Sequence, residues 1–323
     1  MDLIDKQILI TGGTGFIGAA IANKLIDHNC NVNIISRSNE FVWRIKEPKK
    51  CNFYEINLQN SKKLKKCINK VKPEIIFHLA AYVNPECEKE AIDKAYNVNF
   101  NGTKNLVMNL EGYKYVLLIN TGTSEEYGKN KAPFKETFRE SPVSVYSASK
   151  VAATYFCEFF SNVFDKPIIT IRPFLIYGPK QISKSLIPSL IYSGFTKKKL
   201  FLTPCEQTRD FLYIEDVIDA YISLAKNAKK IRKMGIFNLG SGKEIPINEV
   251  VNLLKSRFQE AQYLIGAKNY RIGERMNYYA SIEKIKNVID WKPKWKIHEG
   301  IDKTIEWWKN NKEIVWRYKN IWE

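Results

Sequence analysis

The sequence contains few of the residues that build disulfides and metal sites. Only six cysteines and three histidines occur among its 323 residues, and no two cysteines form a CxxC pair. A disulfide framework or a zinc site needs such residues at short, regular spacing, so the sequence predicts neither. Scattered free thiols fit a reducing compartment, and we expect a cytoplasmic protein without a metal ion.

Long apolar runs are also missing. The longest, such as residues 116–119 and 168–171, are far shorter than the ~20 residues that a membrane-spanning helix needs. Asp2, Asp5 and Lys6 near the start are unlike a signal peptide. Tryptophans near the other end could form an interfacial anchor, but aromatic residues at helical spacing are more typical of a core, so we expect no membrane partner. These tryptophans are Trp291, Trp295, Trp307, Trp308, Trp316 and Trp322.

Acidic residues are too few to balance the basic ones, since 51 Lys and Arg against 34 Asp and Glu leave a net charge of +17. The lysines are spread along the whole chain, and no short basic stretch alternates with aromatic residues as in nucleic-acid-binding segments. We interpret the charge as a solvated surface that would steer an anionic small molecule, with no nucleic-acid partner. With 45% hydrophobic residues, the chain can bury enough apolar surface to exclude a disordered protein.

Short β-branched runs alternate with helical patterns over the first half, which is typical of the α/β class with a doubly wound parallel sheet, the Rossmann fold. The predicted strands are residues 7–11, 31–36, 52–56, 74–79, 115–120 and 168–172, and the predicted helices are residues 15–27, 61–70, 91–109 and 147–160. After Pro173 the alternation weakens, prolines 179, 188 and 204 mark irregular connections, and helices are expected at 216–228, 248–258 and 299–309. We predict a dinucleotide-binding domain over 1–173 with part of 209–240, and a smaller C-terminal substrate-binding lobe over 174–323.

Three glycines follow the first strand and open the first helix. Gly12, Gly15 and Gly18 in TGGTGFIG let a backbone approach a pyrophosphate, which the amides at the helix start then bind. A tight turn alone would use the same residues, but the position between a strand and a helix favours dinucleotide binding. The second strand ends in Ser36 and Arg37 rather than in the acidic residue that binds an NAD ribose. Arg37 therefore favours NADP(H), with NAD(H) as the alternative.

Tyr146 and Lys150 in YSASK are four residues apart and so share one face of a predicted helix. A nearby ammonium favours the phenolate, so we expect Lys150 to lower the pKa of Tyr146. Tyr146 could then exchange a proton with a substrate hydroxyl. The motif is short, and it gains weight from its place after the fifth strand of a dinucleotide-binding fold.

Together with these motifs, further segments make the chain resemble the extended short-chain dehydrogenase/reductases, in the nucleotide-sugar epimerase/dehydratase branch. The segments are HLAA at 78–81, NVNFNGTKNL at 97–106, TSEEYG at 123–128, RPFLIYGP at 172–179, RDFLYIEDV at 209–217 and WKP at 291–293. The resemblance implies that Thr123 hydrogen-bonds the reacting oxygen beside Tyr146, that Lys150 also holds the nicotinamide ribose, and that helices near Ala91 and Ser147 form a homodimer. The other cofactor contacts that it implies are Phe16, Ile17, Asn57, Leu58, Leu79, Ala80, Ala81, Asn99 and Pro173.

The same resemblance places a nucleoside-diphosphate sugar in the site. Arg209 and Arg271 would bind its diphosphate, with surface ion pairs as the alternative reading of both. Leu175 stands where many relatives have Asn, which removes one expected polar contact. Glu125 occupies the position of a functional Glu in similar 4,6-dehydratases and decarboxylases, where it could move a second proton. Alternatively, Glu125 only orders its loop or hydrogen-bonds a sugar hydroxyl.

We expect an NAD(P)-dependent oxidoreductase that acts at C4 of this sugar in carbohydrate biosynthesis. The segment EQTRDFLYIEDV and the short C-terminal lobe resemble 4-ketosugar reductases such as CDP-abequose synthase. A 4,6-dehydratase and a 4-epimerase remain alternatives, because all three share the first hydride transfer. A dinucleotide-binding regulator of the same fold is the alternative from another class, and the intact Thr123, Tyr146 and Lys150 argue against it.

Overall fold

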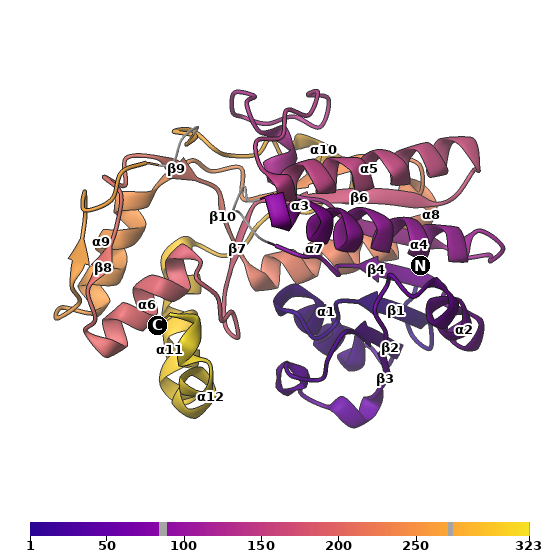
Figure 1. Ribbon diagram of the computed structural model, residues 1–323, viewed down its shortest axis with the longest axis horizontal. Helices are drawn as coiled ribbons and strands as arrows, with labels where there is room; N and C mark the ends of the chain where they lie inside the picture. Colours follow the sequence, from indigo (N-terminus) through magenta and orange to yellow (C-terminus); the bar gives the residue numbers. More distant parts are fainter. Residues whose placement is uncertain (84–88, 271–273, 323) are drawn as a thin grey trace.

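A seven-stranded parallel sheet forms the centre of the computed structural model, which describes residues 1–83, 89–270 and 274–322 (Figure 1). The strand order β11-β6-β5-β4-β1-β2-β3 places β1 beside both β2 and β4, so the chain winds outward from the middle in two directions. This confirms the doubly wound parallel sheet. The strands are β1 (Gln7–Thr11), β2 (Asn31–Ser36), β3 (Cys51–Glu55), β4 (Ile75–His78), β5 (Leu117–Thr121), β6 (Ile168–Pro173) and β11 (Ile236–Leu239).

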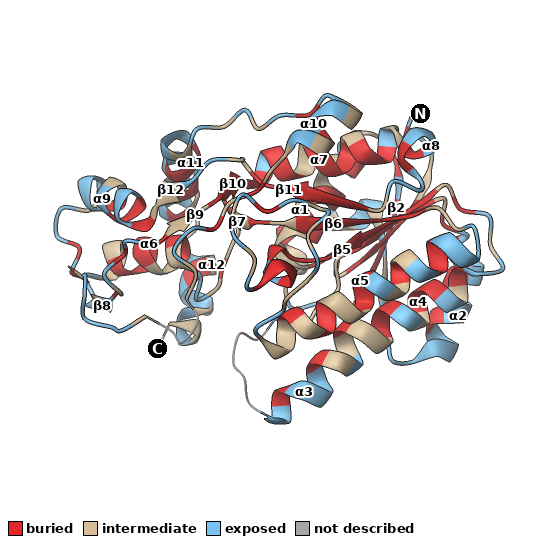
Figure 2. Ribbon diagram, turned by 90° about the horizontal axis from the view of Figure 1, so that it is seen from above, coloured by how far each residue is buried: buried red, intermediate tan, exposed pale blue. Residues whose placement is uncertain are grey.

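Helices cover both faces of the sheet because its strands are apolar on both sides. Ile8 and Ile10 of β1 pack into the core under α1 (Phe16–Asp27) and α7 (Ile214–Lys226). Leu9, which points to the opposite face, belongs to a second core. Figure 2 shows the strands between these two helical layers. The second core is covered by α2 (Ser61–Val71), α4 (Gly102–Leu110) and α5 (Val145–Val163).

The clearest differences from the sequence-based prediction, besides several short strands and helices of the C-terminal part, concern three elements. The single helix expected over 91–109 is divided into α3 (Lys89–Ala95), a π-helical segment Tyr96–Asn101 and α4. A seventh strand, β11, pairs with β6 at the edge of the sheet. A further helix, α6 (Leu186–Thr196), contains Pro188 in its first turn, where the missing N–H of proline costs no helical hydrogen bond.

The smaller C-terminal lobe lies at one end of the molecule, with α6 and α9 (Ile247–Arg257) packed together far from α2 and α4 (Figure 1). Three short strand pairs lie outside the seven-stranded sheet. They are β7 (Leu175–Tyr177) with β10 (Phe211–Tyr213), β9 (Thr208–Arg209) with β12 (Ile245–Pro246), and β8 (Leu200–Phe201) with β13 (Tyr263–Leu264). The remaining helices are α8 (Ala228–Ile231), α10 (Glu283–Ile289), α11 (Ile297–Asn310) and α12 (Lys312–Arg317).

The tryptophans of the last segment pack into the protein as predicted, except Trp316, which is 39% exposed. Trp291 and Trp308 are buried. The tail also returns to the first half of the chain, because the Trp43 indole donates to the Tyr318 hydroxyl at 3.0 Å and the Trp43 and Trp307 rings stack. Among the described residues, no helix is both long and apolar enough to cross a bilayer.

Candidate active site

The glycine turn after β1 brings three segments of backbone together. Gly12 has a φ of +71°, and a Cβ on it would lie 2.7 Å from the Ala80 nitrogen in the loop after β4. A Cβ on Gly18, in the first turn of α1, would lie 2.3 Å from the Gly12 carbonyl oxygen. Only glycine fits at these two positions, because any side chain would clash with the neighbouring backbone. Without side chains there, the amides at the start of α1 face a cavity.

Two connected cavities run along the carboxyl ends of the strands from this turn. One, of about 450 Å³, extends over the ends of β2 and β3, and the other, of about 300 Å³, leads from the turn toward α5. Both contain Gly12, Gly15, Phe16, Leu79 and Ala81. The first is also lined by Ser36, Arg37, Asn57, Leu58 and Ala80, and the second by Ile17, Gly18, Tyr146, Lys150 and Pro173.

Asn99 is the one predicted cofactor residue that lies apart from these walls. Its buried amide donates to the Tyr82 carbonyl at 3.0 Å and to the Ser149 hydroxyl at 2.9 Å, and its side-chain oxygen accepts the Tyr82 N–H at 2.7 Å. The side chain therefore fastens the π-helical segment to α5 and to the loop after β4. In this structure its role is to support the wall of the cavity rather than to form it.

A second arginine, which the sequence analysis missed, lines the larger cofactor cavity. Arg37 is exposed at its rim, whereas Arg44 is only 5% exposed. The Arg44 guanidinium donates to the Thr14 carbonyl of the glycine turn at 3.2 Å and to the Lys180 carbonyl at 3.1 Å, and it lies over the Phe41 ring. Burial lowers the pKa of Arg44 to about 10, so the group stays charged at neutral pH. No sequence motif surrounds it, and only the fold brings it to Thr14.

Three of the four predicted catalytic residues, all but Glu125, meet in the smaller cofactor cavity. Thr123 follows β5, and Tyr146 and Lys150 lie one turn apart near the start of α5. Ser144 caps this helix, since its hydroxyl accepts the Ser147 N–H at 3.0 Å. The Thr123 hydroxyl hydrogen-bonds the Tyr146 side chain, and the buried Lys150 ammonium donates to the Thr121 carbonyl at the end of β5. The arrangement places a phenol, a hydroxyl and a cation at one side of the cavity, and we call these three residues the catalytic wall.

The electrostatics of Tyr146 differ from the expectation. Burial, followed by the negative charge of Glu125, raises the pKa of Tyr146 above its ordinary value, and the hydrogen bond from Thr123 only partly opposes this. Burial also lowers the pKa of Lys150, against the carboxylate of Glu126, which raises it. The expected lowering of the Tyr146 pKa is therefore wrong for this structure, because burial and the Glu125 carboxylate raise this pKa.

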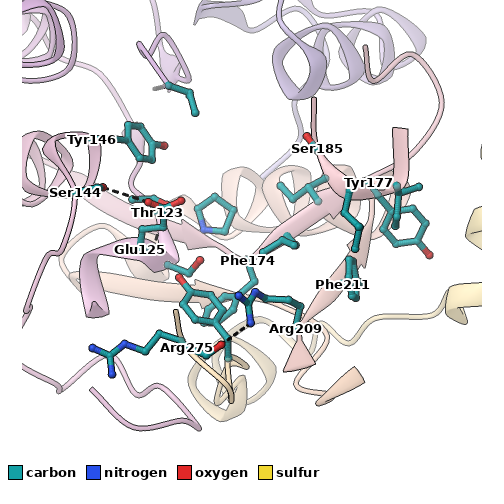
Figure 3. Close-up of a pocket in the computed structure, with 18 of the residues that line it drawn as sticks. Thr123, Glu125, Ser144, Tyr146, Phe174, Tyr177, Ser185, Arg209, Phe211 and Arg275 are labelled. Carbon is teal, nitrogen blue, oxygen red and sulfur yellow. Dashed lines mark hydrogen bonds between the residues drawn. The ribbon is translucent and has the colours of Figure 1, made fainter. Parts of the chain in front are cut away.

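A third cavity, of about 530 Å³, opens from the catalytic wall toward the C-terminal lobe (Figure 3). Glu125 and Tyr146 lie on one side, and the Ser144 hydroxyl donates to the Glu125 carboxylate at 3.5 Å. On the opposite side, Arg209 donates to the Arg275 carbonyl at 2.8 Å. The cavity is thus polar at both sides, as a sugar linked to an anionic group requires.

Of the two arginines predicted to bind a diphosphate, the structure describes only Arg209. Arg209 lines this third cavity and forms an ion pair with Glu274, both side chains being mostly buried. Arg271 lies outside the described residues. Leu175 also lines the cavity, so the wall is apolar where an Asn was expected. Tyr278, which the sequence analysis did not single out, reaches the cavity and lies beneath the Arg209 guanidinium.

Comparison with known proteins agrees with this architecture. Residues 8–240 match the NAD dependent epimerase/dehydratase family. A UDP-glucuronate 4-epimerase of Thermodesulfobacterium geofontis is 28% identical, over 95% of this chain and 97% of its own. The structure of the epimerase Mth375 of Methanothermobacter thermautotrophicus superposes with a TM-score of 0.88 at 24% identity, covering 98% of this chain and 95% of that one. A dTDP-glucose 4,6-dehydratase of Bacillus anthracis, solved in complex with NAD, gives a TM-score of 0.84 at 25% identity over 97% and 99%. The chain therefore belongs to the NAD dependent epimerase/dehydratase family, within the extended short-chain dehydrogenase/reductases.

Proposed function

We propose that this enzyme transfers a hydride at C4 of a nucleoside-diphosphate sugar. The observation that carries the proposal is that Thr123 and Tyr146 line two cavities at once, with Lys150 beside them in one of the two. One cavity begins at the glycine turn, which suits a dinucleotide, and the other contains Glu125 and Arg209, which suits a sugar diphosphate. A regulator without catalysis would not need a phenol beside a buried ammonium at that junction.

The residues present fit a nicotinamide dinucleotide. The close approach at Gly12 and Gly18 leaves room for a pyrophosphate at the start of α1, and the cavity continues past Lys150. Gly15 and the α1 amides would hold the pyrophosphate, and Lys150 would hold the nicotinamide ribose. When bound, the dinucleotide supplies the acceptor and donor of the hydride.

Tyr146 would take the proton from the C4 hydroxyl as C4 is oxidised and return it when the ketone is reduced. Thr123 would hold the C4 oxygen by a hydrogen bond, and the Lys150 ammonium would stabilise charge on the phenolate once substrate is in place. Because the high pKa of Tyr146 disfavours the phenolate, we expect the bound ligands to lower it before proton transfer.

The dinucleotide preference is a finer part of the proposal. We propose that Arg37 pairs with a 2′-phosphate and that the enzyme uses NADP(H), with NAD(H) as the competing choice. The exposed guanidinium at the rim of the cavity and the absence of an acidic residue at the end of β2 support NADP(H). The NAD bound in the Bacillus anthracis relative supports NAD(H).

The fate of the C4 ketone decides between three reactions. If the enzyme releases the ketone, it is a C4 dehydrogenase. If it takes up a 4-keto sugar from solution and reduces it, it is a 4-keto reductase. Return of the hydride to the other face makes a 4-epimerase, the reaction named for the Thermodesulfobacterium relative. Glu125 supports a 4,6-dehydratase, because its carboxylate faces the same cavity as Tyr146 and could remove the C5 proton.

One experiment separates these three reactions. The purified enzyme is incubated with UDP-, dTDP-, GDP- and CDP-hexoses and their 4-keto forms, and the product mass, its configuration at C4 and the nicotinamide absorbance are followed together. We expect Glu125→Gln to keep a substantial part of the activity, with a product that has lost no water and carries no solvent deuterium at C5. Loss of one water from the product, abolished by Glu125→Gln, would instead establish the dehydratase.

We also propose that the enzyme is a homodimer that pairs through α4 and α5. Tyr155, Phe159 and Val163 lie four residues apart along one exposed stripe of α5, and Met108 of α4 is exposed too. Such a continuous apolar stripe favours burial against a second copy.

A further inference from the structure

We infer that Glu126 is a positioning residue for the catalytic wall. The inference rests on the proposed function, because it assigns Glu126 to Thr123 and Lys150 rather than to the fold alone. The side chain of Glu126 is fully buried behind β5, in the short helical turn 124–127 that follows Thr123. Glu126 does not line the two cavities that we assign to the cofactor, and it does not line the cavity that we assign to the sugar.

The two carboxylate oxygens of Glu126 have separate tasks. One oxygen accepts the backbone N–H of Thr123 at 2.8 Å and the Thr154 hydroxyl of α5 at 3.2 Å. The other accepts Nε of Arg172, from β6, at 2.9 Å. One carboxylate therefore links the backbone of Thr123 to the strand and the helix that surround it, and so helps to hold Thr123 at its place in the site.

Gly122 packs directly against this carboxylate. A Cβ on Gly122 would lie 2.4 Å from the Glu126 oxygen that accepts the Thr123 N–H. The glycine between β5 and Thr123 thus opens the space that the carboxylate fills. This contact sits directly beside Thr123, at the residue that precedes it in the chain.

Glu126, Glu140 and Arg172 together carry one net negative charge, which the Lys150 ammonium balances. Arg172 is fully buried and forms ion pairs with both Glu126 and Glu140, so one guanidinium faces two carboxylates. The Lys150 ammonium is also buried, and it donates to the Thr121 carbonyl. A buried ammonium is costly without an opposite charge, and Glu126 supplies one behind the wall.

The titration of this wall involves groups from every element that packs on it. Glu126 raises the pKa of both Lys150 and Tyr146, so its neutralisation lowers both. If the titration of Lys150 or Tyr146 sets the acid or alkaline limb of the pH–rate profile, that limb then moves to lower pH when Glu126 is neutralised. The other charged or titratable groups that face Lys150 and Tyr146 are Glu125, His78, Cys157, Tyr221 and Tyr278.

The test compares Glu126→Gln with Glu140→Gln. Each removes one carboxylate from Arg172 and leaves it the other, so both should lower the thermal unfolding temperature by similar amounts. Only Glu126→Gln should lower kcat, by at least about tenfold with KM changed less than about threefold, and shift the pH–rate profile to lower pH. Equal kcat and equal profiles for the two variants would overturn the inference.

Two more variants keep the test decisive. If Glu126→Gln does not fold, Thr154→Val removes one donor to the same carboxylate without changing any charge. It should then lower kcat about two- to fivefold, and an unchanged kcat would contradict the inference. Tyr146→Phe in the same assay separates the two claims, because an active Tyr146→Phe refutes the proposed function, whereas an inactive one beside an unaffected Glu126→Gln refutes only the role of Glu126.

Discussion

Two arginines at the larger cofactor cavity differ in burial and therefore in what they can do. Arg37 is exposed at the rim of the cavity, just after β2, whereas Arg44 is buried and donates to the Thr14 carbonyl of the glycine turn. A contact to the 2′-phosphate discriminates between dinucleotides. Support of the glycine turn serves both dinucleotides equally.

We predict that Arg37→Ala weakens NADP(H) binding by ~1.5–3 kcal/mol, the strength of a charge-assisted hydrogen bond, and changes NAD(H) binding little. Arg44→Met is the matched comparison, and it should weaken both dinucleotides alike. Calorimetric titration of both cofactors into wild type and the two variants measures this. If Arg37→Ala affects both cofactors equally, Arg37 is an ordinary surface arginine.

At this scale the sequence predicted motif residues better than their supports. Gly12, Thr123 and Tyr146 stand in short patterns, and the structure brings them to the cavities. Glu126 lies within the motif TSEEYG, but the motif does not reveal its contact with Arg172, 46 positions away. Arg44 lies in no motif, and its contact with Thr14 is 30 positions away. Such long-range contacts cannot be read from spacing, because they are set by the tertiary fold.

At the scale of elements, His78 joins β4 to its neighbours. Its Nδ1 lies 2.6 Å from the Thr11 hydroxyl of β1, and its Nε2 lies 2.8 Å from the Thr103 hydroxyl of α4. Because the Thr103 hydroxyl already donates to the Asn99 carbonyl, it accepts from Nε2, and Thr11 donates to Nδ1. The ring is therefore neutral, and burial lowers the pKa of His78 from 6.5 to about 3.

This pKa predicts an acid-sensitive fold. Between pH 6.5 and about 3 the unfolded chain binds a proton at His78 that the folded protein refuses, so stability falls as pH falls through this window. The loss should reach about 2 kcal/mol at pH 5, and His78→Gln should remove that part of the pH dependence. Urea unfolding at pH 7 and pH 5 measures it, with His298→Asn, at an exposed site, as the control. An identical pH slope in His78→Gln would contradict the assignment.

The helices and strands that the sequence predicts best are those with a regular pattern of apolar residues. Strands β1 and β2 have the predicted bounds, because β-branched runs between turn residues mark buried parallel strands. Strand β11 is only four residues long and follows a helical region, and so gave no alternating signal. Helix α6 was missed because Pro188 was interpreted as a break, although a proline in the first turn is compatible with a helix.

At the scale of the whole molecule, the apolar stripe on α5 predicts the oligomeric state. Replacing Phe159, which is 50% exposed at the centre of the stripe, by Asp should place a charge in the dimer interface and give a monomer. Sedimentation velocity of wild type and Phe159→Asp measures this. Phe201→Asp is the control, because Phe201 is 47% exposed but lies on the C-terminal lobe. A wild-type monomer, or a variant that remains a dimer, would contradict this interface.

The proposed function requires that a hydride and a proton move at C4 of a sugar beside Thr123, Tyr146 and Lys150. The most direct test uses nucleoside-diphosphate hexoses that carry deuterium at C4, in single turnovers with wild type and Tyr146→Phe. We predict that deuterium appears on the nicotinamide with wild type. Tyr146→Phe should still bind the dinucleotide but transfer deuterium on the order of 10²–10⁴-fold more slowly, because the transferable proton is gone. Deuterium that stays on C4 with every sugar tested, or transfer by Tyr146→Phe at the wild-type rate, would contradict the proposed function.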